Sequence, residues 1–230
     1  DSLELEREHG ITIKLKAIRL SYQQPTTSNR LSYTLNLLDT PGHVDFSYEV
    51  SRSLASVEGA VLIVDATQGI QAQTLSNFNL SLEANLTLIP VINKIDSPQA
   101  NIPETIEELK LLGFKEEEII KVSAKTGEGV EKLIEEIIKK IPPPISNSPK
   151  SQALIFDSSL DPYKGVIASI RMFGGSIHKG QEIYFLATGT KAQVLQIGYL
   201  SPKPTFISEI GDGEVGFIVT NIKDLSKVKV

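Results

Sequence analysis

Three polar motifs, each at the end of an apolar run, restrict most strongly what this chain can fold into. The apolar runs cover residues 31–37, 86–92 and 119–122. The carboxyl ends of parallel strands meet at one edge of a sheet, so polar residues at such ends gather in one place. The pattern therefore predicts an α/β domain with a site along that edge. The motifs are Asp39-Thr40-Pro41-Gly42-His43, Asn93-Lys94-Ile95-Asp96 and Ser123-Ala124-Lys125.

Helical periodicity separates the predicted strands along the chain. One example is the four-residue spacing of Phe46, Val50 and Leu54. The β-branched run at residues 60–64 is typical of a parallel strand covered on both faces. This alternation of strands and helices predicts a doubly wound, mostly parallel sheet. Further helices are predicted over residues 74–83, 104–112 and 130–141.

A hairpin is predicted ahead of this sheet, from residues 11–20 and 31–38. In its first strand the alternating apolar residues fall first on odd positions, Leu15 and Ala17, and then on even positions, Ile18 and Leu20. Such a change of phase predicts a β-bulge or a twist in the strand.

A proline run marks a change in the character of the chain. Pro142-Pro143-Pro144 ends the last predicted helix, and residues 144–151 form a linker. Short apolar or alternating runs separated by turns then predict a small antiparallel β-barrel. We therefore expect two domains, at residues 1–143 and 152–230. The barrel strands are predicted over residues 152–156, 166–173, 182–185, 192–197 and 216–220.

Composition excludes several kinds of site. The chain has no cysteine, which rules out disulfides and thiolate metal centres within these 230 residues. Its net charge of −5 gives no electrostatic footprint for nucleic acid. No apolar run approaches the ~20 residues that a membrane-spanning helix needs.

The second and third motifs have the chemistry of a guanine site. Asp96 can accept hydrogen bonds from N1–H and N2–H of guanine, whereas adenine has an unprotonated N1 and leaves the carboxylate unpaired. The Lys94 stem can cover the purine face, and the backbone N–H of Ala124 can reach O6. Asn-Lys-x-Asp alone also fits an ordinary polar loop, but all three motifs in this order indicate GTP binding. The predicted base-side residues are Asn93, Lys94, Asp96, Ser123, Ala124 and Lys125.

The first motif, Asp39-Thr40-Pro41-Gly42-His43, fits the phosphate side of the same site, and all five residues are predicted to contact the nucleotide. Its carboxylate can reach Mg²⁺ through water, and its glycine N–H can approach the γ-phosphate closely. Its histidine lies where a water could attack that phosphate. Thr12 can give its hydroxyl to Mg²⁺. The plain alternatives are an ordinary Asp-Thr-Pro-Gly turn and an exposed strand threonine.

A guanine-nucleotide domain followed by a barrel resembles the translational GTPases. The stretch His-Val-Asp-Phe-Ser-Tyr-Glu-Val-Ser-Arg-Ser-Leu at residues 43–54 is similar to the LepA, or elongation factor 4, family, as are residues 153–158, 161–166 and 213–218. The resemblance implies a P-loop GTPase fold and a ribosome-associated enzyme that hydrolyses GTP with Mg²⁺ to influence elongation or back-translocation. It also implies Thr12 and Asp39 as metal ligands and His43 as the catalytic residue.

The same resemblance implies partners and location. The expected partners are the ribosome, through rRNA and ribosomal proteins, and tRNA, mostly through domains outside this sequence; DNA is not expected. The expected location is the cytoplasm or an organelle, with peripheral association to the cytoplasmic face of the cell membrane as an option known in the family.

Two departures from the family stand out. His9 occupies a position where the family usually has arginine, and no Gly-x-x-x-x-Gly-Lys-[Ser/Thr] occurs in the 230 residues. That loop would cradle the phosphates and follow a central strand. We therefore expect an internal fragment that lacks the first strand, the phosphate loop and the end of the barrel, and that is inactive by itself. The alternative is a degenerate GTPase-like binding module without hydrolysis.

Overall fold

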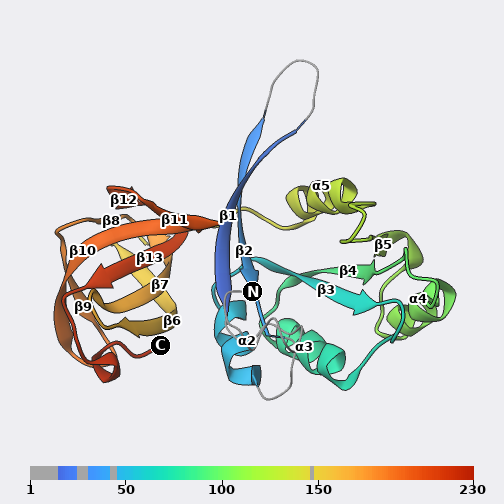
Figure 1. Ribbon diagram of the computed structural model, residues 1–230, viewed down its shortest axis with the longest axis horizontal. Helices are drawn as coiled ribbons and strands as arrows, with labels where there is room; N and C mark the ends of the chain where they lie inside the picture. Colours follow the sequence, from blue (N-terminus) through green and yellow to red (C-terminus); the bar gives the residue numbers. More distant parts are fainter. Residues whose placement is uncertain (1–14, 25–30, 42–45, 146–147) are drawn as a thin grey trace. The chain divides into compact units, whose positions relative to one another are not determined.

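The computed structural model describes residues 15–24, 31–41, 46–145 and 148–230 (Figure 1). Contacts divide the chain into two compact units, Gly42–Pro143 and a second unit that combines Asp1–Pro41 with Pro144–Val230. The N-terminal hairpin is thus grouped with the C-terminal segment. The domain boundaries expected from the sequence, 1–143 and 152–230, stay a prediction.

The first unit, Gly42–Pro143, is built on a parallel sheet. Strands β3 (Gly59–Asp65), β4 (Thr87–Asn93) and β5 (Ile120–Lys121) pair in the order β3-β4-β5. The register of β3 and β4 is continuous and ends with Asp65 opposite Asn93. The predicted α/β class with its parallel sheet is confirmed. The helices are α2 (Ser47–Leu54), α3 (Ala72–Glu83), α4 (Ile102–Leu111) and α5 (Val130–Lys140), with a short 3₁₀-helix η2 (Glu116–Glu118).

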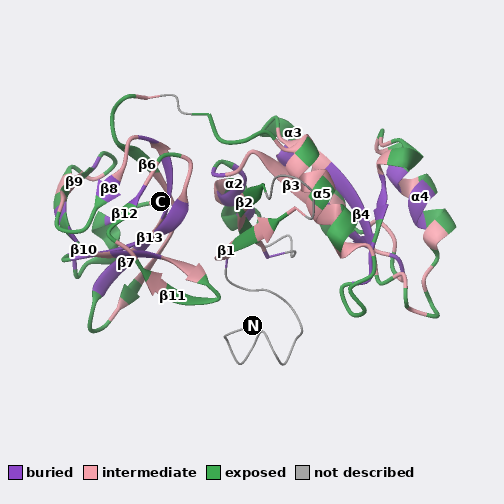
Figure 2. Ribbon diagram, turned by 90° about the horizontal axis from the view of Figure 1, so that it is seen from above, coloured by how far each residue is buried: buried purple, intermediate pink, exposed green. Residues whose placement is uncertain are grey.

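Strand β4 is the centre of the core in this unit, because apolar clusters cover it from both sides. On one side Ile92 packs with Leu62, Val64 and residues of α4, including Ile106 and Leu109. On the other side Ile89 and Val91 pack with Ile120, Val122 and the apolar face of α5. Figure 2 shows β4 as a buried stretch. Since both faces are covered, β4 ends in a fixed position from which its terminal polar residues can act.

Strand β3 is more exposed to solvent than its sequence predicts. Leu62 and Val64 are buried, but Ile63 between them is 57% exposed. Among the described residues β3 pairs with β4 alone, so its other edge lies open. The expectation that residues 60–64 are covered on both faces is therefore wrong at Ile63, although Val61 on the same face packs against Ile89 and Val91.

The hairpin of the second unit consists of β1 (Lys16–Gln23) and β2 (Ser32–Asp39), which pair antiparallel without a register shift from Lys16↔Asp39 to Gln23↔Ser32. The bulge predicted in β1 is absent. Ala17 and Ile18 simply point to opposite faces of the strand, as neighbouring residues do. One face packs Leu15, Ala17 and Leu38 on the barrel residues Phe156 and Val215. On the other, Leu20 and Leu37 are more than 40% exposed.

The C-terminal segment forms the predicted antiparallel barrel sheet, ordered β11-β10-β13-β7-β6 with β9 beside β10, and a separate β12-β8 pair. Its core is made of fully buried aliphatic residues such as Val166, Ile170 and Ile218. None of the helices in the described ranges is long and apolar enough to cross a membrane. The strands are β6 (Gln152–Asp161), β7 (Gly165–Gly174), β8 (Ile177–His178), β9 (Glu182–Phe185), β10 (Thr190–Ser201), β11 (Lys203–Phe206), β12 (Glu209–Ile210) and β13 (Val215–Thr220), followed by a 3₁₀-helix η3 (Leu225–Lys227).

Arg19 of β1 makes polar contacts between the hairpin and this barrel. Its guanidinium pairs with Glu214 Oε1 at 3.0 Å and donates to the Val215 carbonyl at 2.9 Å. It also lies 4.1 Å from the centre of the Tyr199 ring. The Arg19 side chain is only 12% exposed and that of Glu214 is 37% exposed, so the ion pair is partly shielded from water.

Candidate nucleotide-binding site

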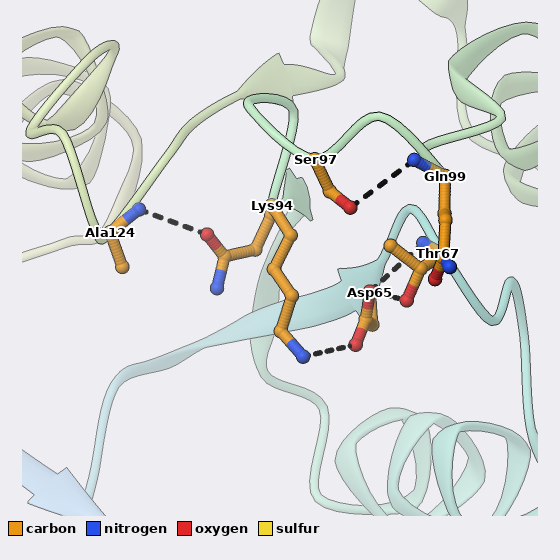
Figure 3. Close-up of polar contacts among 7 residues, drawn as sticks. Asp65, Thr67, Lys94, Ser97, Gln99 and Ala124 are labelled. Carbon is orange, nitrogen blue, oxygen red and sulfur yellow. Dashed lines mark hydrogen bonds and ion pairs between the residues drawn. The ribbon is translucent and has the colours of Figure 1, made fainter.

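The two base-side motifs meet at the carboxyl ends of β4 and β5. Asn93 is the last residue of β4, and its Oδ1 accepts a hydrogen bond from the backbone N–H of Ala124 at 3.0 Å (Figure 3). Ser123 donates its hydroxyl to Asp96 Oδ1 at 2.6 Å. These two hydrogen bonds join the loop after β4 to the loop after β5 and fix their relative position.

A cavity of about 410 Å³ opens between these two loops. Its volume is within the range of small-molecule sites in proteins. Five of the six predicted base-side residues line it, and the sixth, Ser123, is buried behind it where it supports Asp96. The lining residues are Asn93, Lys94, Asp96, Ser97, Pro98, Ala124 and Lys125.

Asp96 is held in its charged form. The Ser123 hydroxyl lowers the pKa of Asp96 below the ordinary value of 3.8; desolvation opposes this, and the Lys125 charge adds to it. An ionised carboxylate is an acceptor only and has about four lone-pair positions. One of them is used by Ser123, which leaves acceptor capacity for two donors on the edge of a base.

A further acidic residue, which the sequence did not single out, lies at the end of β3. Asp65 Oδ1 accepts hydrogen bonds from the backbone N–H of Thr67 at 2.9 Å and from its hydroxyl at 2.7 Å. Asp65 Oδ2 forms an ion pair with Lys94 Nζ at 2.6 Å, as Figure 3 shows. The signal available in the sequence was its position, at the end of an apolar strand like the three motifs.

The charge of Asp65 is also stabilised. Burial alone would raise the pKa of Asp65, but the hydrogen bonds from Lys94 and Thr67 outweigh it and keep the pKa below 3.8. The Asp65 carboxylate that faces Lys94 is therefore ionised at neutral pH.

The backbone at Lys94 is unusual. Its φ is +64°, in the left-handed region that residues other than glycine, asparagine and aspartate seldom adopt. Neighbouring bonds support it, since Ala66 N–H donates to the Asn93 carbonyl at 2.9 Å and Ser97 N–H donates to the Lys94 carbonyl at 3.0 Å. The loop turns sharply here, which directs the chain from β4 around the cavity.

The phosphate-side residues are only partly described. Asp39 is the last residue of β2, as predicted; it is exposed, and Thr40 and the buried Pro41 follow it. These three belong to the unit of the hairpin and barrel, whereas the base-side residues belong to the other. Thr12, Gly42 and His43 lie outside the described residues, so the predicted metal and catalytic roles stay predictions.

Of the two predicted metal ligands, Thr12 and Asp39, only Asp39 lies in the described ranges, where it is exposed. Mg²⁺ is a hard cation that prefers carboxylate and water oxygens and is held by few protein ligands, so an exposed carboxylate at a strand end fits it. The described residues contain no group of three His, Cys, Asp or Glu side chains that could bind a metal ion by themselves.

Comparison with known proteins finds relatives over the whole chain. The family model for the elongation factor Tu GTP binding domain matches residues 1–143. Among curated relatives, elongation factor 4 of Rubrobacter xylanophilus is 51% identical over 231 residues, covering 100% of this chain and 38% of that protein. Elongation factor 4 of Thermobifida fusca is 49% identical over 232 residues, covering 100% of this chain and 37% of that protein.

A solved structure gives the same fold. Bacterial selenocysteine-specific elongation factor EF-Sec matches with a TM-score of 0.78 and 24% identity, over 100% of this chain and 39% of that one. The chain spans a little under two fifths of the length of the proteins it matches. The curated relatives named here, which the chain matches over its whole length, are elongation factor 4 (LepA) proteins, and by its family model the chain belongs to the elongation factor Tu GTP-binding-domain family.

Proposed function

We propose that the chain is part of a ribosome-associated translational GTPase of the elongation factor 4 type, which binds GTP and hydrolyses it to GDP and phosphate. The observation that carries this is the cavity between the β4 and β5 ends, with an ionised Asp96 at its rim and Asn93 bonded to Ala124. Membership of the family agrees with it.

Guanine is selected by the pairing of its edge with Asp96. The carboxylate accepts from N1–H and N2–H, while the Ala124 N–H faces O6. In this structure that N–H donates to Asn93 Oδ1, so guanine O6 would share this hydrogen or displace the Asn93 oxygen from it. Adenine offers neither of these two donors. It would leave a desolvated carboxylate unpaired, which costs about 1–3 kcal/mol or more.

The phosphates are handled by the remaining predicted residues. Thr12 and Asp39 would hold Mg²⁺, which when bound neutralises charge on the phosphates. Gly42 gives its N–H to the γ-phosphate, and His43 orients the water that attacks it. A glycine-rich phosphate loop is also required, and its strand would pair with the open edge of β3, where Ile63 is exposed.

The partner in this function is the ribosome, which stimulates hydrolysis during elongation or back-translocation, with tRNA as a further contact. The place of action is the cytoplasm or an organelle. Peripheral contact with a membrane stays a prediction from the family resemblance.

Exchange of the base-reading carboxylate tests this function in a full-length protein that contains the chain. Asp96→Asn replaces an acceptor by an amide that also donates, so preference should shift from GTP toward XTP, whose C2 oxygen can accept. The readout is ribosome-stimulated release of phosphate with each nucleotide in competition. Ribosomes should stimulate the parent with GTP and the variant with XTP.

Glu107→Gln is the matched control, because it removes an exposed carboxylate of α4 that pairs with Lys110 and does not line the cavity. It should leave GTP preference unchanged. An Asp96→Asn variant that still prefers GTP as strongly as the parent would show that Asp96 does not read the base. A parent that ribosomes do not stimulate would contradict the proposed activity itself.

A further inference from the structure

We propose that Asp65 is a positioning residue for the nucleotide, which fixes Lys94 so that the lysine stem is ordered at the cavity before a purine arrives. This inference rests on the proposed function and extends it to a residue on a third strand. Asp65 does not line the cavity and would not touch the base, so its effect would pass through Lys94.

The sheet itself brings Asp65 to this place. The parallel register of β3 and β4 sets Asp65 opposite Asn93, one residue before Lys94. Ala66 N–H then donates to the Asn93 carbonyl at 2.9 Å, which ties the loop after β3 to the loop after β4. The distance between the Asp65 carboxylate and the Lys94 backbone is thus set by strand pairing.

The orientation of the carboxylate is fixed by a residue that has no other role in the site. Thr67 donates its backbone N–H and its hydroxyl to Oδ1 of Asp65, at 2.9 and 2.7 Å. Oδ2 is thereby directed to Lys94 Nζ, at 2.6 Å. The Asp65 side chain is 22% exposed and Lys94 is 56% exposed, so a shielded, rigid anion holds a flexible cation.

Ordering of Lys94 matters because lysine is among the side chains that lose most rotamer entropy when fixed. A free lysine would have to be ordered by the ligand, and that loss would reduce affinity. Its ammonium is held by Asp65 and its backbone has the left-handed conformation, and in this arrangement Lys94 already lines the cavity. Exposed ion pairs contribute little by themselves, so the benefit expected here is preorganisation of the site.

The test is a double-mutant cycle in the full-length protein, read by calorimetric titration with GDP and with GTP. Asp65→Asn keeps an oxygen that can accept from Thr67 but loses the charge that holds Lys94. It should weaken GDP and GTP alike by roughly tenfold, a usual coupling between contacting residues, and should leave kcat at saturating GTP unchanged. Guanine preference over xanthine should also stay, because Asp96 is untouched.

Lys94→Met provides the second arm, since methionine keeps an unbranched stem but has no ammonium for Asp65 to hold. In the Lys94→Met background, Asp65→Asn should cost no further affinity, within about twofold. Glu104→Gln on α4, which loses an exposed carboxylate away from the cavity, is the control and should bind as the parent does.

Three results would overturn the inference. If the Asp65→Asn variant binds GDP as tightly as the parent, the ion pair with Asp65 does not order Lys94 for binding. An equal loss with and without Lys94→Met shows that Asp65 acts through the fold and not through the lysine. A parent with no preference for guanine nucleotides overturns the proposed function and this inference with it.

Discussion

Ser123 is fully buried, whereas Asp96, to which its hydroxyl donates, is exposed at the cavity rim. The hydroxyl oxygen also accepts from the backbone N–H of Thr126 at 3.1 Å. Its proton is therefore directed at the carboxylate rather than free to rotate. At the scale of single residues, the chemistry of Asp96 is set by a neighbour that a ligand does not reach.

Ser123→Ala should raise the pKa of Asp96 back toward 3.8, because the hydroxyl is the largest cause of its lowering. A carboxyl whose pKa is lowered in the fold stabilises the folded state at pH values above its ordinary pKa. That contribution is lost as the pH falls through the lowered value. The acid transition of Asp96 should thus begin at a higher pH in the variant, as NMR titration of its carboxyl carbon would measure.

Ser97→Ala is the matched control, since Ser97 also lines the cavity but its hydroxyl accepts from the Gln99 N–H. It should leave the titration of Asp96 in place. An unchanged midpoint in Ser123→Ala would mean that the hydroxyl does not bond the carboxylate in solution.

The sequence predicted that Asn93, Asp96 and Ala124 lie together, because the motifs follow strands that were expected to be neighbours, and the three residues do line one cavity. Their roles toward a base stay predictions. Asp65 was missed, since its contact with Lys94 depends on the register between two strands, and the sequence does not state that register.

At the scale of elements, the hairpin β1-β2 depends on the barrel for its packing. Its inner face supplies Leu15 and Leu38 to a cluster with Phe156 and Val215, and Arg19 adds an ion pair beside them. Removing Arg19 would leave the Glu214 carboxylate without this partner and the Val215 carbonyl without its donor.

Arg19→Met should lower the free energy of unfolding of the unit that contains the hairpin by about 1–3 kcal/mol. This is the usual loss when a buried hydrogen-bonded partner is removed. Methionine keeps much of the apolar stem, so the loss reports the guanidinium contacts. Urea unfolding followed by circular dichroism would measure it.

Lys191→Met gives the comparison, because Lys191 pairs with Glu182 at the same 3.0 Å but both side chains are more than 65% exposed. Exposed pairs contribute about 0–1 kcal/mol, so this variant should be nearly as stable as the parent. Equal losses in the two variants would contradict the role given to Arg19.

Elements were predicted well where periodicity extends over several turns or a whole strand. The four α-helices described in the first unit were predicted from the sequence. In the barrel, β8 and β12 were missed because two residues carry no period, and the four-residue β11 was missed as well. The prediction of a bulge in β1 was wrong. Apolar residues occur on both faces of that strand, and this pattern looks the same in sequence as a change of phase. Exposure of Ile63 could not be read from a β-branched run, since it depends on how many strands flank β3.

At the scale of the whole molecule, the 230-residue chain alone should bind GTP weakly. It has the base-side cavity, but its sequence contains no Gly-x-x-x-x-Gly-Lys-[Ser/Thr] to hold the phosphates. Base contacts alone should give a Kd no tighter than about 100 µM, near −5.5 kcal/mol, and no measurable hydrolysis. Calorimetry on this chain would check it, and nanomolar binding would mean that another segment holds the phosphates.

The contact between Arg19 and Val215 joins residues that are 196 positions apart in the sequence. A nascent chain grows by ~5–20 residues per second, so β1 leaves the peptidyl-transferase centre about 10–40 s before Val215 is made. During that interval Leu15 and Leu38 have been synthesised, but the barrel surface that covers them has not. Docking of the hairpin is consequently a late event of cotranslational folding, and slower decoding near the end of this segment should lengthen the time during which chaperones can bind the hairpin.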